Sequence, residues 1–106
     1  MTEEQLKLSR DLAYHPAFKW ELGMLAIYED PTAWQPLFLS HPADIRYVEG
    51  KAYPDITDPS TVGVMLYTLS EGGVKSIVHA PLTKEEFGSI VARELLKELN
   101  QKDTNV

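Results

Sequence analysis

The stretch that decides the fold is residues 54–69, which read PDITDPSTVGVMLYTL. Asp58 is placed to cap a helix, because its carboxylate can accept hydrogen bonds from the first backbone N–H groups, and Pro59 suits the first helical position. Asp55 is expected to form an Asx-type turn before it. The apolar residues that follow recur at i, i+3, i+4 and i+7, the spacing of an amphipathic helix: Val62, Met65, Leu66 and Leu69. The stretch therefore predicts a helix in the middle of the chain, entered through a structured loop.

Sequence patterns that predict helices also occur at both ends of the chain. Thr2 and Gln5 have capping-box spacing and predict a helix over about residues 3–13, which ends before Pro16. Thr83 and Glu86 repeat the spacing and open a long apolar stripe that predicts a helix to about residue 100. The stripe comprises Phe87, Ile90, Val91, Leu95, Leu96 and Leu99. The polar tail, residues 101–106, is expected to fray.

Strands are predicted between the first and middle helices. Residues 22–28 are apolar on both faces, which predicts a central strand, and Gly23 indicates a bulge or the close approach of another backbone. Residues 34–39 predict a second strand, which Pro36 limits to an edge.

Further strands are predicted on both sides of the middle helix. Residues 45–48 and 52–53 flank Glu49-Gly50-Lys51 and predict a hairpin, with glycine supplying a positive φ. After the middle helix, Gly72-Gly73 predict its end, and the alternation in residues 74–79 predicts another strand. We therefore expect a single α+β domain over residues 1–106, with a mainly antiparallel sheet of three to five strands. Helices at the N-terminus, middle and C-terminus are expected to pack on one face.

Composition narrows the classes of function. The 106 residues are 43% hydrophobic and 25% charged, the ordinary mix of one globular domain. There is no cysteine, which excludes disulfides, thiolate nucleophiles and cysteine-ligated zinc. Sixteen acidic and ten scattered basic residues give a net charge of −6, so no nucleic-acid binding is expected. No apolar run approaches the roughly 18 residues that span a membrane, and the acidic start does not resemble a signal peptide. We expect a cytoplasmic protein.

Candidate catalytic or metal-binding side chains are few. The three histidines lie far apart, each just before a proline: His15, His41 and His79. This spacing does not predict a metal site, and no cofactor is expected. The carboxylates of Asp44, Asp55 and Asp58 can in principle bind a hard cation or do acid–base work. Capping and turn formation nevertheless account for Asp55 and Asp58 without chemistry.

Three residues are candidates for an interaction surface. Trp34 follows a turn and is the aromatic residue for which we most expect exposure, although a place in the core is an open alternative. Phe38 lies in the same predicted strand. Leu96 widens the apolar arc of the last helix beyond what a small sheet buries. Leftover apolar surface marks interfaces, and two-fold dimers are common, so we expect a protein partner or a homodimer.

Two segments together resemble a known group of sequences. They are Trp20-x-x-Gly23-Met24 and the run from Pro54-Asp55 through Asp58-Pro59 to Gly63, followed by a helix opened by Thr-x-x-Glu. The chain thus resembles small uncharacterised bacteriophage and prophage proteins with Trp-x-x-Gly-Met and Pro-Asp-Leu-x-Asp-Pro-Ala-Thr-x-Gly motifs. It departs from them at Val64, where cysteine is common, and at residues 74–79, where a tryptophan-rich strand is usual. The resemblance implies a viral or prophage source and a cytoplasmic setting, and no reaction.

Three functions are compatible with these features. The first is a phage or prophage accessory protein that acts as a non-catalytic protein-interaction domain. The second is an acidic mimic of nucleic acid that inhibits a host protein, which a line of carboxylates at phosphate-like spacing would favour. The third is a small hydrolase using Asp44, Asp55, Asp58 and a histidine, which their convergence in a pocket would favour. The lack of a catalytic constellation in the sequence favours the first.

Overall fold

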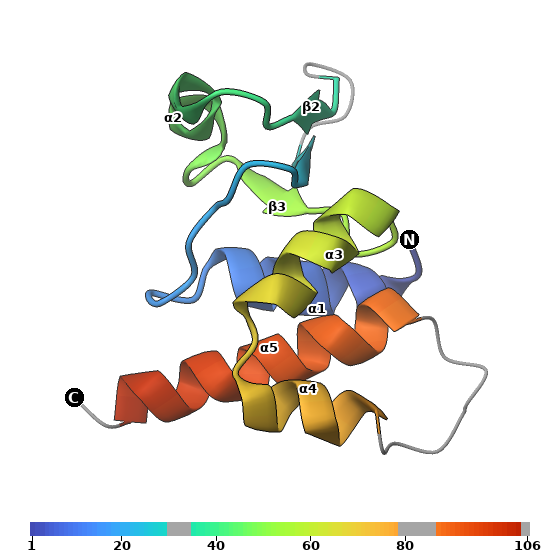
Figure 1. Ribbon diagram of the computed structural model, residues 1–106. Helices are drawn as coiled ribbons and strands as arrows, with labels where there is room; N and C mark the ends of the chain where they lie inside the picture. The colour runs from blue at the N-terminus through green and yellow to red at the C-terminus, as the bar shows by residue number, and fades with distance from the viewer. Residues whose placement is uncertain (30–34, 79–86, 105–106) are drawn as a thin grey trace.

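The computed structural model describes residues 1–29, 35–78 and 87–104 (Figure 1). Five helices and three strands lie in these ranges, together with one 3-10 helix, η1. In chain order they are α1 (Glu3–Ala13), β1 (Leu25–Tyr28), β2 (Leu37–Phe38), η1 (Pro42–Asp44), α2 (Ile45–Val48), β3 (Ala52–Pro54), α3 (Pro59–Thr68), α4 (Glu71–Val78) and α5 (Phe87–Thr104). The predicted α+β class, with helices at the N-terminus, middle and C-terminus, is confirmed.

The sheet is antiparallel and has the order β2-β1-β3. The central strand is therefore β1, as predicted, although it begins at Leu25 and not at Leu22. Residues 22–23 form a turn instead, because Gly23 takes a φ of 97°, outside the extended region. The edge strand β2 is shorter than predicted, and Trp34 lies outside the described residues.

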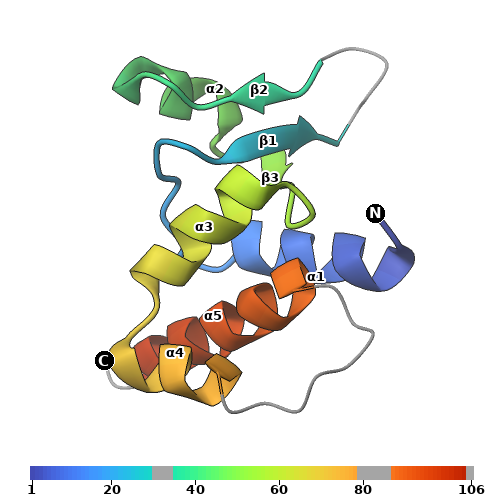
Figure 2. The same cartoon turned by 45° about the vertical axis from the view of Figure 1, so that its right-hand side comes forward.

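Four helices lie together on one side of the sheet. Helix α3 runs between the sheet and α5, and α1 packs against β3 and α5 (Figures 1 and 2). Helix α2 is set apart from them at the top of both views. The core between these layers is apolar, and its largest fully buried side chains include Leu12, Met24, Leu39, Ile56, Met65, Val48 and Val91.

Hydrogen bonds between neighbouring residues determine where α1 begins. The predicted capping box of α1 is confirmed: Thr2 Oγ1 accepts from Gln5 N–H at 3.2 Å, and Gln5 Oε1 accepts from Thr2 N–H at 2.8 Å. The second predicted box, Thr83 with Glu86, lies outside the described residues. Helix α5 continues through Thr104, beyond the predicted end near residue 100, and the fraying of the tail stays a prediction.

The strand predicted over residues 74–79 is wrong, because residues 71–78 form the helix α4. Gly72 and Gly73 lie in its first turn and do not end α3, which stops at Thr68. Ser70 starts α4 by accepting the Gly73 N–H at 3.1 Å, and its own N–H donates to the Glu98 carboxylate on α5. Packing of Gly73 against α5 thus overrides the weak helix propensity of two glycines and the β-branched residues that follow.

The hairpin predicted around residues 49–51 is also wrong. Residues 45–48 are the helix α2, and β3 pairs with β1 instead. The Asp44 carboxylate explains the difference, since it accepts the backbone N–H groups of Ser40 and His41 and folds the chain into η1 just before α2. Gly50 does take the predicted positive φ, 73°, but in a turn from helix to strand.

Within the ranges described above, every helix is too short or too polar to cross a lipid bilayer.

Candidate functional site

The two sequence motifs meet in space where the turn at residues 20–24 docks on the first turn of α3. Ser60 Oγ donates to the Gly23 carbonyl oxygen at 2.6 Å, and the Leu25 N–H donates to Thr61 Oγ1 at 2.8 Å. On the other side of the turn, the Gly23 N–H donates to the Leu39 carbonyl oxygen at 2.8 Å. These bonds fix the turn between the sheet and α3.

Glycine is required at position 23 for two reasons. Its φ of 97° is unfavourable for other residues, and an added Cβ would lie 2.9 Å from Val64 Cγ2 of α3. The sequence predicted a bulge or the close approach of another backbone at Gly23; the structure shows a turn instead, and the close neighbour is the Val64 side chain. The flanking motif residues Trp20 and Met24 are buried, and the Trp20 ring meets the Phe18 ring edge-on at 5.4 Å.

The start of α3 has the predicted caps. Asp58 Oδ2 accepts from the Thr61 N–H at 3.0 Å and from the Thr61 hydroxyl at 3.2 Å, and Pro59 is the first helical residue. Asp55 Oδ1 accepts from the Thr57 N–H at 3.0 Å, as an Asx-type turn requires. The carboxylates of both aspartates thus accept hydrogen bonds from backbone N–H groups two or three residues further along the chain.

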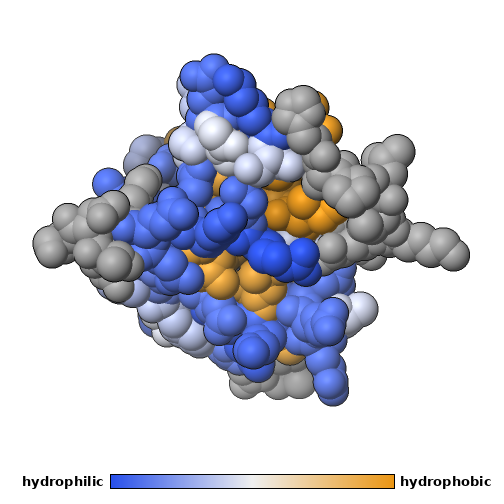
Figure 3. Space-filling view, turned by 90° about the horizontal axis from the view of Figure 1, so that it is seen from below, coloured by the Kyte–Doolittle hydropathy of each residue, from blue (hydrophilic) through white to orange (hydrophobic). Residues whose placement is uncertain are grey.

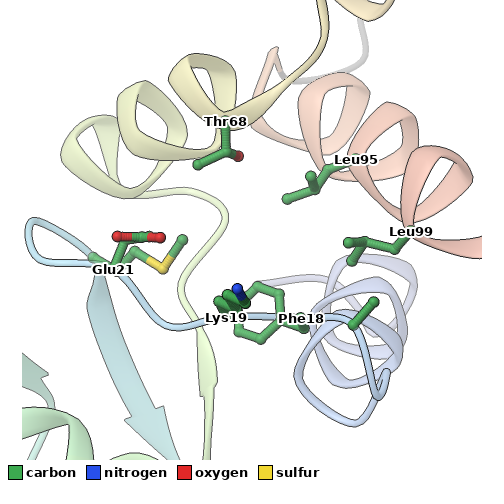
Figure 4. A pocket seen from close by; sticks show the side chains of 8 residues that line it. Phe18, Lys19, Glu21, Thr68, Leu95 and Leu99 are labelled. Carbon is green, nitrogen blue, oxygen red and sulfur yellow. The ribbon is translucent and has the colours of Figure 1, made fainter. Parts of the chain in front are cut away.

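A groove opens between this turn and the outer face of α3. We call it the α3 groove; it has a volume of about 880 Å³ and is lined by Glu21, Leu22, Ser60, Gly63, Val64, Tyr67 and Thr68. Two of these residues, Glu21 and Thr68, also line a neighbouring cavity of about 380 Å³. Figure 4 shows that Leu95 and Leu99 reach this second cavity from α5, opposite Glu21, with Phe18 and Lys19 from the loop after α1.

The wall that α3 contributes to the α3 groove carries no charge, and Glu21 on the opposite wall is the one charged residue among those that line it. Residues 59–70 contain no Asp, Glu, Lys or Arg, in a chain whose residues are 25% charged. Tyr67 is 91% exposed and Leu22 is 44% exposed, so both present apolar surface to water. Depletion of charge and enrichment of tyrosine are features of the centre of protein interfaces.

Of the three interaction residues predicted from the sequence, two are described by the structure, and both lie away from the α3 groove. Trp34 is outside the described residues, Phe38 is 49% exposed on the edge strand β2, and Leu96 is half-buried against the core. Phe38 and Leu96 do not line the α3 groove. Sequence reasoning missed Leu22 and Tyr67, although the run of residues 59–70 without charge was a visible signal.

A second apolar surface lies beside α4 and α5. Val78 is 71% exposed and Phe87 is 51% exposed. Figure 3 shows apolar side chains gathered between hydrophilic ones on this face.

Asp44 and His15, two of the side chains considered for chemistry, have hydrogen-bond partners within the chain. Asp44 accepts the N–H groups of His41 and Ser40 at 3.0 Å each, and these bonds hold its pKa below the ordinary value. His15 bonds the Asn100 side chain through Nε2 and accepts the Ala17 N–H at Nδ1. His79 lies outside the described residues, and among those described no three His, Asp or Glu side chains are arranged to hold a metal ion.

One charged cluster ties α1 to the end of β1. Arg10 donates to both oxygens of Glu29, at 3.0 and 2.9 Å, and Tyr14 donates its hydroxyl to the same carboxylate at 3.0 Å. The bonds from Arg10, followed by that from Tyr14, lower the pKa of Glu29. The same bonding raises the pKa of Arg10 and of Tyr14. These hydrogen bonds join α1 to the end of β1.

Comparison with known proteins adds no identity: no protein-family model matches the chain, and neither does a curated protein or a solved structure. The geometry of the α3 groove is therefore the basis for a proposed function.

Proposed function

We propose that the protein is a non-catalytic protein-interaction domain, a small cytoplasmic accessory protein of a bacteriophage or prophage, and that it binds its partner through the α3 groove. The observation that carries the proposal is the uncharged outer face of α3, on which Tyr67 is 91% exposed beside a groove of about 880 Å³. The viral source rests on the resemblance of the two motifs.

The physical basis is the position of the two exposed side chains. Tyr67 and Leu22 contribute little to the core, because much of each side chain is in water. Both are supported by rigid elements: Tyr67 by α3, and Leu22 by a turn that is hydrogen-bonded to Ser60 and Leu39. A rigid tyrosine loses little conformational entropy on binding, which is why tyrosine is frequent among the residues that dominate binding energy.

Nothing in the described part of the chain favours the two alternatives over this proposal. For the hydrolase, Asp44, Asp55 and Asp58 each accept hydrogen bonds from their own loops, as described above. For the nucleic-acid mimic, two of the acidic side chains form ion pairs, Glu29 with Arg10 and Glu71 with Lys75.

The test is affinity capture from a lysate of the bacterial host, with quantitative mass spectrometry and matched variants. Tyr67→Glu and Leu22→Glu each place a charge in the α3 groove and should reduce the captured partner at least about tenfold, a change that corresponds to about 1.4 kcal/mol. Tyr47→Glu is the control, because Tyr47 is 62% exposed on α2 and does not line the groove. Circular dichroism should show all three variants folded. Equal capture by Tyr67→Glu and the unaltered protein would contradict the proposal.

A further inference from the structure

The cavity beside the α3 groove has a floor of buried apolar side chains. Its volume of about 380 Å³ falls within the roughly 300–1,000 Å³ of small-molecule sites in proteins. We call it the α5 cavity; it is lined by Ala17, Phe18, Lys19, Glu21, Met24, Thr68, Leu95 and Leu99 (Figure 4). Because Met24, Leu95 and Leu99 are buried, an apolar group that enters the cavity meets the core of the domain.

The loop that forms one wall of the α5 cavity is held in place by hydrogen bonds. His15 accepts the Ala17 N–H at its Nδ1 and the Phe18 N–H at its carbonyl oxygen, each at 3.0 Å. The Nε2 of the same histidine bonds the Asn100 side chain of α5 at 3.0 Å. The Phe18 ring also meets the Trp20 ring edge-on. These contacts form the wall before any ligand binds, which reduces the entropic cost of binding.

Two charged side chains of opposite sign lie at the rim of the α5 cavity. Lys19 and Glu21 are both exposed, and Figure 4 shows their charged groups apart from one another. Among the residues that the structure describes, neither side chain forms an ion pair or a hydrogen bond. The rim can therefore bind one negative and one positive group of a ligand at the same time.

These two charges favour a zwitterion over a simple acid or amine. A carboxylic acid with an apolar tail would pair with Lys19 but bring its carboxylate near Glu21, and an apolar amine would do the reverse. An α-amino acid carries its ammonium group, its carboxylate and its side chain on one carbon. It can therefore pair with both rim charges while an apolar side chain enters the cavity.

We propose that the α5 cavity binds a free α-amino acid with an apolar side chain, such as leucine or methionine. Lys19 pairs with the carboxylate of the ligand, Glu21 pairs with its ammonium group, and its side chain packs on the apolar floor. The site is separate from the interaction function proposed for the α3 groove and needs no protein partner.

The test is a titration of the isotope-labelled protein with leucine, followed by two-dimensional NMR. Titration to about 10 mM approaches saturation for a dissociation constant of up to about 1 mM. We expect saturable shifts of the backbone amide signals of the residues that line the α5 cavity. Isocaproate is leucine without the ammonium group, and isoamylamine is leucine without the carboxylate. Each should bind at least about threefold more weakly than leucine, a modest factor because ion pairs at an exposed rim are weak.

Matched variants test the role of each charge. Glu21→Gln should bring the dissociation constants of leucine and isocaproate together, and Lys19→Met should do the same for leucine and isoamylamine. Glu49→Gln and Lys51→Met are the controls, because both residues are exposed and neither lines the cavity, and they should leave all three constants unchanged. All four substituted side chains are exposed, so circular dichroism should show every variant folded.

Three results overturn the inference. The first is that about 10 mM leucine leaves the amide signals of the cavity residues unshifted. The second is equal binding of leucine and both analogues, which would mean that the cavity does not recognise the two charges. The third is that Glu21→Gln and Lys19→Met discriminate among the three ligands as the unaltered protein does. None of these measurements involves a protein partner, so their failure leaves the function proposed for the α3 groove standing.

Discussion

Replacing Thr61 with valine should loosen the attachment of α3 to the sheet without changing the shape of the core. Thr61 is fully buried, and its Oγ1 accepts the Leu25 N–H at 2.8 Å while its hydroxyl donates to Asp58 Oδ2 at 3.2 Å. Valine has nearly the same shape and forms neither bond. The Leu25 N–H, at the start of the central strand, then loses its acceptor.

The expected magnitude follows from that unpaired donor. Leaving a buried donor without an acceptor costs about 1–3 kcal/mol, and the lower half of this range applies because the bond is only partly buried. We expect the free energy of unfolding to fall by about 1.5 kcal/mol. Since 1 kcal/mol shifts the melting temperature of a domain near this size by about 4–8 °C, the melting temperature should fall by roughly 6–12 °C.

The assay is urea and thermal unfolding followed by circular dichroism, with Thr68→Val as the matched control. Thr68 is exposed on the same helix, and its hydroxyl donates to the Met65 carbonyl oxygen, which water can solvate instead. The control should change stability by less than about 0.5 kcal/mol. Equal destabilisation by the two variants would refute the role given to the bond between Thr61 and Leu25.

Three further predictions concern stability. Gly88→Ala should destabilise the protein by more than about 1 kcal/mol in urea unfolding, because the new Cβ overlaps the Ile56 carbonyl oxygen; a neutral result would mean that α5 does not lie against that backbone. Asp58→Ala should cost about 1 kcal/mol through loss of the α3 cap, and an unchanged urea midpoint would contradict the capping role. The pKa of Glu29 is lowered by its hydrogen bonds from Arg10, so its contribution is present above the ordinary carboxyl pKa of 4.5 and is lost as pH falls through the lower pKa of the folded state. Glu29→Gln should therefore flatten the fall in stability below pH 4.5, and an acid limb as steep as in the unaltered protein would contradict this role.

Elements set by short-range hydrogen bonds were predictable from the sequence. The start of α1 depends on Thr2 and Gln5, three residues apart, and the start of α3 depends on Asp58 and Thr61, also three apart. In both places the donor, the acceptor and the helical spacing lie within one turn. Local chemistry was enough there, because no distant residue is needed to satisfy the backbone.

The element α4 was not predictable in this way. Val74 and Ile77 fit a helix as i and i+3, but the alternation through Val78 fits a strand equally well. Contacts with α5 decide between the two. Glu98 of α5 accepts the Ser70 N–H, and Gly73 is buried close to the same carboxylate. These partners lie about 25 residues away in sequence, and periodicity alone carries no information about them.

The candidate site was visible in part. A helix with Val62 and Met65 buried must turn Tyr67 toward solvent, and the absence of charge in residues 59–70 marks that outer face. The second wall of the α3 groove was not visible. It is built by Leu22, whose place beside α3 depends on the long-range bond from Ser60 to Gly23.

The motif residues divide into those that build the fold and one that does not. Trp20 and Met24 fill the core, Gly23 allows the turn, and Asp55, Asp58 and Pro59 shape the entry to α3. Gly63 belongs to the same run of sequence and has no such role within the described chain. The bond from Ser60 to Gly23 holds the turn that carries Leu22 against α3, and Tyr67 lies on α3 itself, whose first turn Asp58 caps. The motifs therefore form a support that presents two exposed side chains, Leu22 and Tyr67, beside the outer face of α3.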